Sequence, residues 1–452
     1  MYVDASEQTK FDNNIRIKKF RDEYMDEIYN CMQCGYCLPS CPTYEITAKE
    51  SASPRGRIAL MKAYADGKLE MNKQLENALY FCLGCRACES ACPAGVKYGH
   101  LLEGVRESIE GTKRDQHQNH WIRKTIFDHT FNNTKRIRFA GKMLYYAQAS
   151  GLQKLANQTG MVKVLPKSLA NMQQAVEPVA SPKDRKKRTK VMEAIGTAKA
   201  KVWLTTGCVM DMMFFETNQN TAKILNKLGF EVHFYANEQC CGAMHAHSGE
   251  KATALELAKK NIEIFENSQV DYILSNAGGC GAAFKEYGYW FQHDKVWKER
   301  AEQFSSKVRD MNEFLYDMRD ILNFQSFPKK VTFQNSCHLA HGQKITLEPR
   351  TLIQMIPDIQ WIELDANDSC CGSAGIYGVT NFDTSMVILD KKFTKIKKMQ
   401  VDYIVVTNPP CLIQMKLGVK RAGLEQQVKV IHIIDLLHMV MKNPVKTNCN
   451  LE

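Results

Sequence analysis

The sequence predicts an α/β-rich multidomain protein, in which a helical, cysteine-rich N-terminal domain precedes two duplicated α/β domains. Two observations carry this prediction. Eight of the 17 cysteines lie in two short runs within the first hundred residues. After residue 200 the chain repeats itself, and V-D-Y-I occurs at 270–273 and again at 401–404. The 452 residues, 44% hydrophobic and 24% charged, suffice for several globular domains of ordinary composition.

The repeated half accounts for the α/β class. Its first unit passes from V-W-L-T-T-G-C through E-Q-C-C-G to V-D-Y-I-L-S-N-A-G-G-C, and its second from V-T-F-Q-N-S-C through D-S-C-C-G to V-D-Y-I-V-V-T-N-P-P-C. In each unit a β-rich run ends at a cysteine, a helical stretch follows, and a second β-rich run ends at another cysteine. Open α/β sheets place their sites at the carboxyl ends of such strands. We expect these two domains, called CCG domains after their Cys-Cys-Gly, over 201–325 and 326–445.

Two segments join the cysteine runs to the repeats. Residues 111–175 form a basic segment of helical character, in which aromatic and aliphatic side chains interleave with the lysines and arginines of 112–146. This is either a solvated helix packed on the body of the protein or a docking surface for a membrane or a partner subunit. Residues 176–200 contain Pro178, Pro182 and K-D-R-K-K-R-T-K and are typical of a linker. No stacking platform or base-reading motif accompanies this basic run, so nucleic acid is not an expected partner.

Composition and cysteine usage restrict the partners, the location and the chemistry that can be expected for this protein. The formal net charge is +11, which suits an anionic membrane face or an acidic partner. The N-terminus has no apolar signal region, and no apolar run is long enough to span a bilayer, so a cytoplasmic protein, peripheral at most, is expected. Clustered thiols in a reducing compartment indicate metal or redox chemistry rather than disulfides. Cys449 lies outside the four cysteine groups and is expected to be a free thiol.

Both N-terminal cysteine runs match the bacterial ferredoxin pattern C-x2-C-x2-C-x3-C-P. Three closely spaced thiolates on a tight turn grip one face of a [4Fe–4S] cluster, while the fourth lies too far round and ligates the cluster of the other run. A pair of zinc sites would also use C-x2-C, but it needs neither the fourth cysteine nor the repeated C-P ending. Residues 1–110 are therefore expected to form a two-cluster [4Fe–4S] ferredoxin-type domain. One cluster would use Cys31, Cys34, Cys37 and Cys92, and the other Cys82, Cys85, Cys88 and Cys41.

The CCG cysteines form two further candidate sites. Adjacent thiolates cannot point into one site from a regular strand, so the following Gly242 or Gly372 is expected to supply a bend. Four sulfurs in each domain would then hold a further iron–sulfur cluster or a zinc ion, or remain as thiols. The nearby His338, His341, His245 and His247 are either ligands and substrate-binding groups or buried structural histidines. The candidate ligands are Cys208, Cys240, Cys241 and Cys280 in the first domain and Cys337, Cys370, Cys371 and Cys411 in the second.

Together these motifs resemble the iron–sulfur subunit of bacterial glycolate oxidase. The two C-P runs, the intervening S-P-R-G-R-I, the two C-C-G units and the phrases C-L-G-C-R-A-C-E, G-V-K-Y-G, C-H-L-A-H and N-P-x-C carry the resemblance, in order, over nearly the whole chain. The resemblance implies an electron-transfer subunit without catalytic residues of its own. It would accept electrons from FAD-bearing partner subunits that oxidise glycolate or lactate, and pass them to a quinone-type acceptor at the inner face of the cell membrane. No G-x-G-x-x-G with a suitable acidic residue and no Walker lysine loop occurs in the chain, in agreement with this role.

The C-C-G units also resemble those of heterodisulfide reductase subunits, whose fullest form ends in C-x-x-C. Here the first position of that pair is Ala277 in one unit and Asn408 in the other, which argues against a five-cysteine cluster in either. Two alternatives therefore stand beside the electron-transfer subunit. One is an enzyme that reduces a disulfide at a CCG-bound cluster, and the other is a scaffold whose CCG domains hold zinc.

Overall fold

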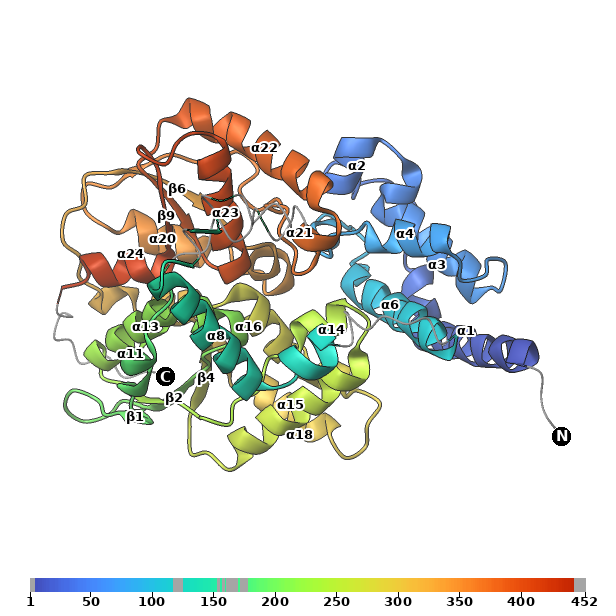
Figure 1. The fold of residues 1–452 in the computed structure, drawn as a ribbon, viewed down its shortest axis with the longest axis horizontal. Helices are drawn as coiled ribbons and strands as arrows, with labels where there is room; N and C mark the ends of the chain where they lie inside the picture. Colours follow the sequence, from blue (N-terminus) through green and yellow to red (C-terminus); the bar gives the residue numbers. More distant parts are fainter. Residues whose placement is uncertain are drawn as a thin grey trace.

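The computed structural model describes residues 5–116, 125–152, 155–156, 159, 170 and 178–442. The N-terminal helical domain lies to one side and the two α/β domains to the other (Figure 1). This arrangement confirms the predicted fold class. Cys449 and much of the basic segment expected at 111–175 lie outside the described residues.

The N-terminal domain is organised by two long helices that pack side by side, α1 and α6. Phe20, Tyr24 and Ile28 recur at helical spacing on α1 and are buried. Gly104 of α6 faces Tyr24, and a β-carbon there would lie 2.3 Å from the tyrosine ring, so only glycine permits this approach. The elements are α1 (Ala5–Tyr29), α2 (Pro42–Thr47), η1 (Glu50–Ala52), α3 (Pro54–Ala65), α4 (Lys73–Tyr80), α5 (Ala87–Ser90) and α6 (Tyr98–Asp115).

The first CCG domain contains a five-stranded sheet in the order β1-β3-β2-β4-β5. β1 is antiparallel to β3, and the other pairs are parallel. Its elements are β1 (Val191–Met192), β2 (Lys201–Leu204), α12 (Cys208–Met213), α13 (Phe215–Lys227), β3 (Glu231–His233), α14 (Ala243–His247), α15 (Lys251–Glu266), β4 (Tyr272–Ser275), α16 (Gly278–Lys285), α17 (Tyr287–Trp290), α18 (Lys298–Ser306), β5 (Val308–Asp310), α19 (Met311–Asp317) and η5 (Arg319–Ile321).

The second CCG domain repeats the central part of the first with a four-stranded parallel sheet in the order β7-β6-β8-β9. The paired strands β6 and β8 correspond to β2 and β4. Its elements are β6 (Lys330–Gln334), η6 (His338–Gly342), α20 (Leu347–Gln354), β7 (Gln360–Trp361), α21 (Tyr377–Thr380), α22 (Phe382–Met399), β8 (Tyr403–Val406), α23 (Pro409–Arg421), β9 (Lys429–His432) and α24 (Ile433–Val440).

The two CCG domains share one hydrophobic core. Val202 and Phe230 of the first domain belong to the same buried cluster as Phe333 and Ile433 of the second. The helices α13 and α24 pack against each other across this boundary. Because the apolar faces of both sheets are buried together, the pair is a single structural unit that holds its two sets of strand ends in a fixed relation.

The segment before the first sheet packs on the first CCG domain. Its described elements are η2 (Thr125–Phe131), α8 (Thr134–Ala149) and α11 (Pro182–Lys186). Ile137 and Gly141 of α8 are buried, and Gly141 lies close to Met212. Part of the segment expected as a linker is thus ordered, since α11 and β1 both lie within 176–200. Among the described residues no helix has the length and apolar character needed to cross a membrane.

The N-terminal domain docks on the first CCG domain through a close backbone contact. Gly249, in the turn after α14, has φ +80°, and a β-carbon there would lie 2.4 Å from the carbonyl oxygen of Arg106 on α6. Beside this contact, Lys251 Nζ lies 2.8 Å from Glu23 Oε1 of α1. The seam therefore depends on a residue without a side chain.

Substituting Gly249→Ala should loosen this seam. Alanine at positive φ costs about 1–2 kcal/mol, and the backbone of Arg106 cannot move away as a flexible side chain would. Gly67→Ala is the matched control, because Gly67 has φ +70° but nothing within 4 Å of the added carbon. We expect thermal unfolding followed by circular dichroism to show a melting temperature several degrees lower for Gly249→Ala than for Gly67→Ala. Equal losses in the two variants would show that the contact contributes nothing.

Candidate functional site

The two ferredoxin-type runs adopt the same unusual backbone turn. Gln33 and Gly35 flank Cys34 in the first run with φ of 56° and 88°, and Gly84 and Arg86 flank Cys85 in the second with φ of 65° and 63°. Left-handed φ at a residue other than glycine is strained and marks functional turns. In the second run the Gly84 N–H donates a hydrogen bond to Cys82 Sγ at 3.3 Å. The turn thus directs backbone N–H groups toward sulfur, as an iron–sulfur site requires.

The structure brings the fourth cysteine of each run to the other run. Cys92 and Cys88 of the second run line a small cavity together with three cysteines of the first. We call four of these site 1: Cys31, Cys34, Cys37 and Cys92. The remaining four are called site 2: Cys82, Cys85, Cys88 and Cys41. Burial, followed by the charges of neighbouring groups that include Cys85, Cys82 and Cys41, raises the pKa of Cys88, so these thiols lie close together.

The two sites differ in exposure. Cys34 of site 1 is exposed, and its neighbours Met32 and Tyr36 are 67% and 70% exposed. In site 2 Cys85 and Cys88 are buried, as is Cys41. Site 1 therefore faces solvent, whereas site 2 faces the interior of the protein.

The four cysteines of each CCG domain also come together at the strand ends. In the first domain Cys240 Sγ lies 3.7 Å from Cys208 Sγ, and Cys241 contacts both Cys240 and Cys280. Gly242 has φ +82° and supplies the bend between the paired cysteines and α14. Cys280 follows β4, which is paired with the strand that precedes Cys208, so the parallel register accounts for this convergence.

The second CCG domain repeats this geometry. Cys370 contacts Cys337, and Cys371 contacts Cys411. Gly372 has φ +93°, and its N–H donates to Cys370 Sγ at 3.4 Å. In neither CCG domain, nor elsewhere in the described part of the chain, are three His, Cys, Asp or Glu side chains arranged around a point suited to a single metal ion.

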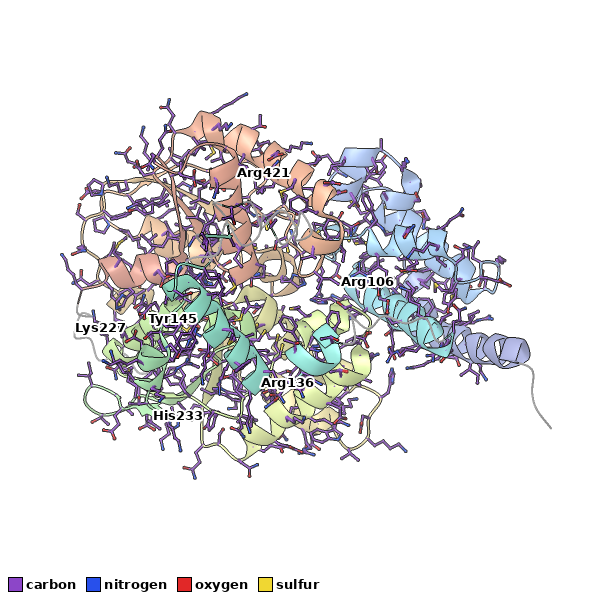
Figure 2. The ribbon with its side chains drawn as sticks, in the orientation of Figure 1. Arg106, Arg136, Tyr145, Lys227, His233 and Arg421 are labelled. Carbon is purple, nitrogen blue, oxygen red and sulfur yellow. The ribbon has the colours of Figure 1, made fainter. Side chains whose placement is uncertain are left out.

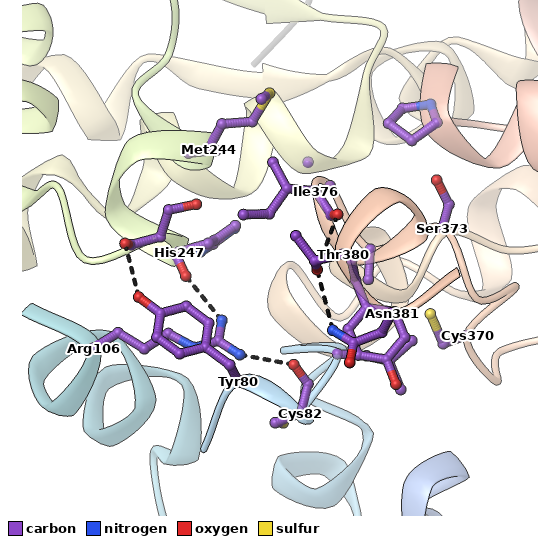
Figure 3. A pocket seen from close by; sticks show the side chains of 18 of the residues that line it. Tyr80, Cys82, Arg106, Met244, His247, Cys370, Ser373, Ile376, Thr380 and Asn381 are labelled. Carbon is purple, nitrogen blue, oxygen red and sulfur yellow. Dashed lines mark hydrogen bonds between the residues drawn. The ribbon is translucent and has the colours of Figure 1, made fainter. Parts of the chain in front are cut away.

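One cavity of about 860 Å³ is lined by the eight CCG thiols and by one thiol of site 2. It lies where the N-terminal domain meets both CCG domains, and Figure 3 shows contributions from each. Arg106 of α6 spans one wall, where it donates to the carbonyl oxygens of His247 at 2.8 Å and Cys82 at 2.7 Å. The cysteines that line the cavity are Cys82 of site 2 and the eight of the CCG domains, Cys208, Cys240, Cys241, Cys280, Cys337, Cys370, Cys371 and Cys411.

Two of the four candidate histidines line this cavity. His338 Nδ1 lies 3.6 Å from Cys337 Sγ, and His247 Nδ1 lies 2.6 Å from Glu103 Oε1. The other two make structural contacts. His245 is fully buried, with Nε2 3.2 Å from the carbonyl oxygen of Phe127.

His341 joins the second CCG domain to the N-terminal domain. Its Nδ1 lies 2.8 Å from Ser90 Oγ, while its Nε2 lies 3.0 Å from the carbonyl oxygen of Asp368. The first contact crosses the seam, and the second fixes the ring within its own domain.

The residues that replace the first cysteine of C-x-x-C have a structural role. Asn408 accepts a hydrogen bond from the Gly279 N–H at 3.2 Å and directs its own amide nitrogen to Cys411 Sγ at 3.9 Å. Gly279 belongs to the first CCG domain, so Asn408 joins the two domains at their strand ends. Ala277, at the corresponding position, is buried, and its backbone forms hydrogen bonds with the Ser275 hydroxyl and the Gly281 N–H. Neither position supplies a fifth sulfur.

Comparison with known proteins agrees with this architecture. Family models match three parts of the chain: "4Fe-4S dicluster domain" at 27–96, "Glycolate oxidase iron-sulfur subunit, linker region" at 118–176, and "Cysteine-rich domain" at 202–285 and 331–416. The "Probable glycolate oxidase iron-sulfur subunit" of Bacillus subtilis is 44% identical over 433 residues, which cover 93% of this chain and 97% of that protein. The chain belongs to the glycolate oxidase iron–sulfur subunit family.

Two further relatives match large parts of the chain. The "Glycolate oxidase iron-sulfur subunit" of Escherichia coli is 30% identical over 389 residues, which cover 84% of this chain and 88% of that protein. "Lactate utilization protein A" of Oceanobacillus iheyensis is 30% identical over 239 residues, which cover 53% of this chain and 96% of that protein. The predicted family is thereby confirmed, together with its iron–sulfur and oxidoreductase character.

Three buried cations near the thiols were not singled out as site residues from the sequence. Burial opposes ionisation of Cys82, but the charges of Arg57 and Arg106 outweigh it and lower its pKa. Within the second CCG domain, burial lowers the pKa of Lys392 to about 8, and this lysine donates to the carbonyl oxygens of Ala366 and Ser369. Arg57 lies within S-P-R-G-R-I, one of the phrases that resemble the glycolate oxidase iron–sulfur subunit family, so the sequence contained a signal for this residue. Lys392 is one of several lysines on α22 and carries no distinguishing pattern.

A buried ion-pair cluster fixes the Cys85 turn to the first CCG domain in this family member. Arg86 follows Cys85, pairs with Glu89 at 3.0 Å and also contacts Glu286, which ends α16. Burial opposes ionisation of Glu286, but the neighbouring His100, with Nε2 3.8 Å away, and the charge of Arg86 outweigh burial and hold its pKa well below the usual range. This stabilisation is present at neutral pH and is lost as the pH falls through the lowered pKa.

Substituting Arg86→Met should destabilise the protein strongly. Two carboxylates would remain buried without a cation, and breaking a buried pair in this way costs about 3–5 kcal/mol. Arg300→Met is the control, because its pair with Glu266 is about one-third exposed and such surface pairs contribute about 0–1 kcal/mol. Urea unfolding at pH 7 should separate the two variants, and the difference between wild type and Arg86→Met should shrink in acid. Similar losses for both substitutions would contradict a special role for Arg86.

Proposed function

We propose that this chain is the electron-transfer subunit of a 2-hydroxy-acid dehydrogenase complex, with glycolate as substrate of the complex and lactate as the alternative. It would receive electrons from an FAD-bearing partner and deliver them to a quinone-type acceptor. The observation that carries the proposal is that Cys92 lies with the three closely spaced cysteines of the first run, and Cys41 lies with those of the second. The glycolate oxidase and lactate utilization names of its relatives support the substrate class.

The residues at both sites fit [4Fe–4S] clusters. Each set offers four thiols, and the left-handed turns around Cys34 and Cys85 present backbone N–H groups to sulfur. We assign Cys31, Cys34, Cys37 and Cys92 to one cluster and Cys82, Cys85, Cys88 and Cys41 to the other. A cluster held by four thiolates supplies one-electron chemistry.

The chain's own residues define a direction through the molecule. Met32 and Tyr36 surround the exposed edge of site 1 and offer a partner the aromatic and methionine contacts common in interfaces. Tyr98 lines site 1 and also neighbours Cys82 and Cys88 of site 2, so the two sites are adjacent. From site 2, Cys82 lines the large cavity. Electrons would therefore enter at site 1 and leave by way of this cavity.

The crossed ligand assignment can be tested with single substitutions. Cys92→Ser should alter the same reduced-cluster EPR signal as Cys34→Ser, and Cys41→Ser the same signal as Cys85→Ser. In the assembled complex, all four variants should lower quinone reduction at least tenfold while glycolate still reduces the partner's flavin. Cys449→Ser, outside the four groups, is the control and should change neither readout. If Cys92→Ser instead altered the signal lost in Cys85→Ser, the ligand assignment would be wrong.

The contents of the CCG sites are measurable independently. Iron, sulfide and zinc per chain, measured on protein purified without oxygen, distinguish the possibilities. About eight irons and no zinc correspond to the two ferredoxin-type clusters alone. Additional iron would place a redox centre in a CCG domain, whereas zinc would make that domain a scaffold.

A second candidate function is reduction of a disulfide at the CCG thiols. The observation that favours it is that all eight CCG cysteines line one cavity, within reach of a single small molecule. Disulfide reductase activity of the isolated chain, lost on Cys370→Ser and retained on Cys449→Ser, would support it. If neither the isolated chain nor its Cys449→Ser variant has this activity, electron transfer remains the function of the subunit.

The exposed face of α8 is the proposed membrane contact. Phe139, Met143 and Tyr146 are 63%, 54% and 57% exposed and follow one another at helical spacing. Lys135 and Lys142 are exposed beside them, and α8 contains no acidic residue. Apolar side chains flanked by lysines are typical of helices that lie on anionic bilayers. The labels of Arg136 and Tyr145 mark this helix in Figure 2.

Substituting Lys135→Glu and Lys142→Glu together should weaken binding to vesicles that contain phosphatidylglycerol at least tenfold, since each basic residue near an anionic membrane surface contributes about 1 kcal/mol. Arg138 is not a suitable target, because it donates to the carbonyl oxygen of Ala236. Lys397→Glu with Lys398→Glu, exposed on α22, gives the same charge change elsewhere. Co-sedimentation with the vesicles measures the binding of both double variants. Equal binding by the two variants would exclude α8 as the contact.

A further inference from the structure

Two buried guanidinium groups beside site 2 have no acidic partner. Arg57 is fully buried, with Nε donating to the carbonyl oxygen of Ala78 at 2.8 Å and Nη2 to Thr43 Oγ1 at 3.1 Å. Its Nη1 has no hydrogen-bond partner among the described residues. Arg106 is 7% exposed, donates to the carbonyl oxygen of Cys82, and leaves its Nε without a partner in the same part of the chain. Neither forms an ion pair with a described carboxylate.

Burying a cation without a counter-charge is strongly unfavourable. The neighbouring Arg86 follows the usual solution, since it pairs with Glu89 and Glu286. Arg57 and Arg106 have no such carboxylate partner, which indicates that another negative group compensates their positive charges.

The ionisable groups that face Arg57 are a thiol from each cysteine run and the Tyr98 hydroxyl. Its guanidinium neighbours Cys82 and Cys41, and Cys41 Sγ lies 3.3 Å from the same Thr43 hydroxyl to which Arg57 donates. Cys82 and Cys41 belong to one ligand set only under the crossed assignment. The counter-charge of Arg57 is therefore the thiolate-ligated cluster proposed for site 2.

Among the described residues, no comparable buried charge lies beside site 1. The cation beside it is Arg55, whose side chain is 31% exposed and whose Nε lies 2.8 Å from Glu50 Oε1. A paired, partly exposed guanidinium is neutralised by its partner and screened by solvent. The two sites thus differ in the charge that surrounds them, although their backbone turns match.

We propose that Arg57, with Arg106 beside it, makes site 2 the more easily reduced of the two sites and so sets the direction of electron flow. Reduction adds one negative charge to a cluster, and a buried cation stabilises the more negative state. In the step concerned, one electron leaves the cluster in site 1, which is oxidised, and enters that in site 2, which is reduced. No bond changes, and the electron comes from the flavin of the partner subunit. This inference rests on the proposed function.

The test is an EPR-monitored redox titration of the full chain purified without oxygen. Arg57→Gln should lower the higher of the two midpoint potentials by at least about 59 mV. For a one-electron couple, this shift is a tenfold change in the ratio of reduced to oxidised cluster at fixed potential. Arg57→Lys keeps the charge and should restore most of the wild-type value. Arg55→Gln is the matched control and should leave the higher potential in place.

Each outcome is decisive. A shift of the lower potential, or of neither, with both clusters still assembled would overturn the inference and leave the electron-transfer function standing. If Arg57→Gln fails to fold, Arg106→Gln takes its place, because Arg106 faces Cys82 of the same site and should shift the same potential downward. An unchanged higher potential there would equally overturn it. Wild-type protein that carries no iron and no EPR signal after anaerobic purification would instead disprove the proposed function itself.

Discussion

The burial of thiols around a shared interior is the constraint on which the rest of the structure depends. Sulfur ligands are useful as thiolates, and buried thiolates are stable only where cations, backbone N–H groups or a metal compensate their charge. The left-handed turns at Gly84 and Gly372 supply N–H groups. Arg57, Arg106 and Lys392 supply positive charge. Of these groups, Arg106 also joins the N-terminal domain to the first CCG domain.

Duplication explains how the CCG thiols reach one cavity. In each domain parallel strand pairing sets a lone cysteine beside the last one, and the shared hydrophobic core turns the strand ends of the two domains toward each other. Asn408 then joins the domains at this edge through Gly279. In the second domain, the position where heterodisulfide reductase subunits would have a sulfur is therefore part of the contact between the repeats.

The sequence predicts those features of the structure that follow from local residue spacing and from repeats. Cysteine spacing identified both ferredoxin-type runs, and the strand-to-cysteine repeat predicted the two α/β domains and their neighbouring strands. It could not predict contacts between distant residues. Arg86 and Glu286, or His341 and Ser90, are paired by packing alone. The short strand β1 lies in a segment whose composition is that of a linker, because only pairing with β3 makes it a strand.

The asymmetry between two similar cysteine runs follows from where each is placed. The first run lies at the surface, where solvent screens charge and a partner can approach Cys34. The second is enclosed by three domains, where the same charges act at low dielectric and have larger effects. One sequence pattern, used twice, thus gives two different electrostatic environments. The duplication of the pattern makes a pair of sites, but it is their unequal burial that gives the pair a direction.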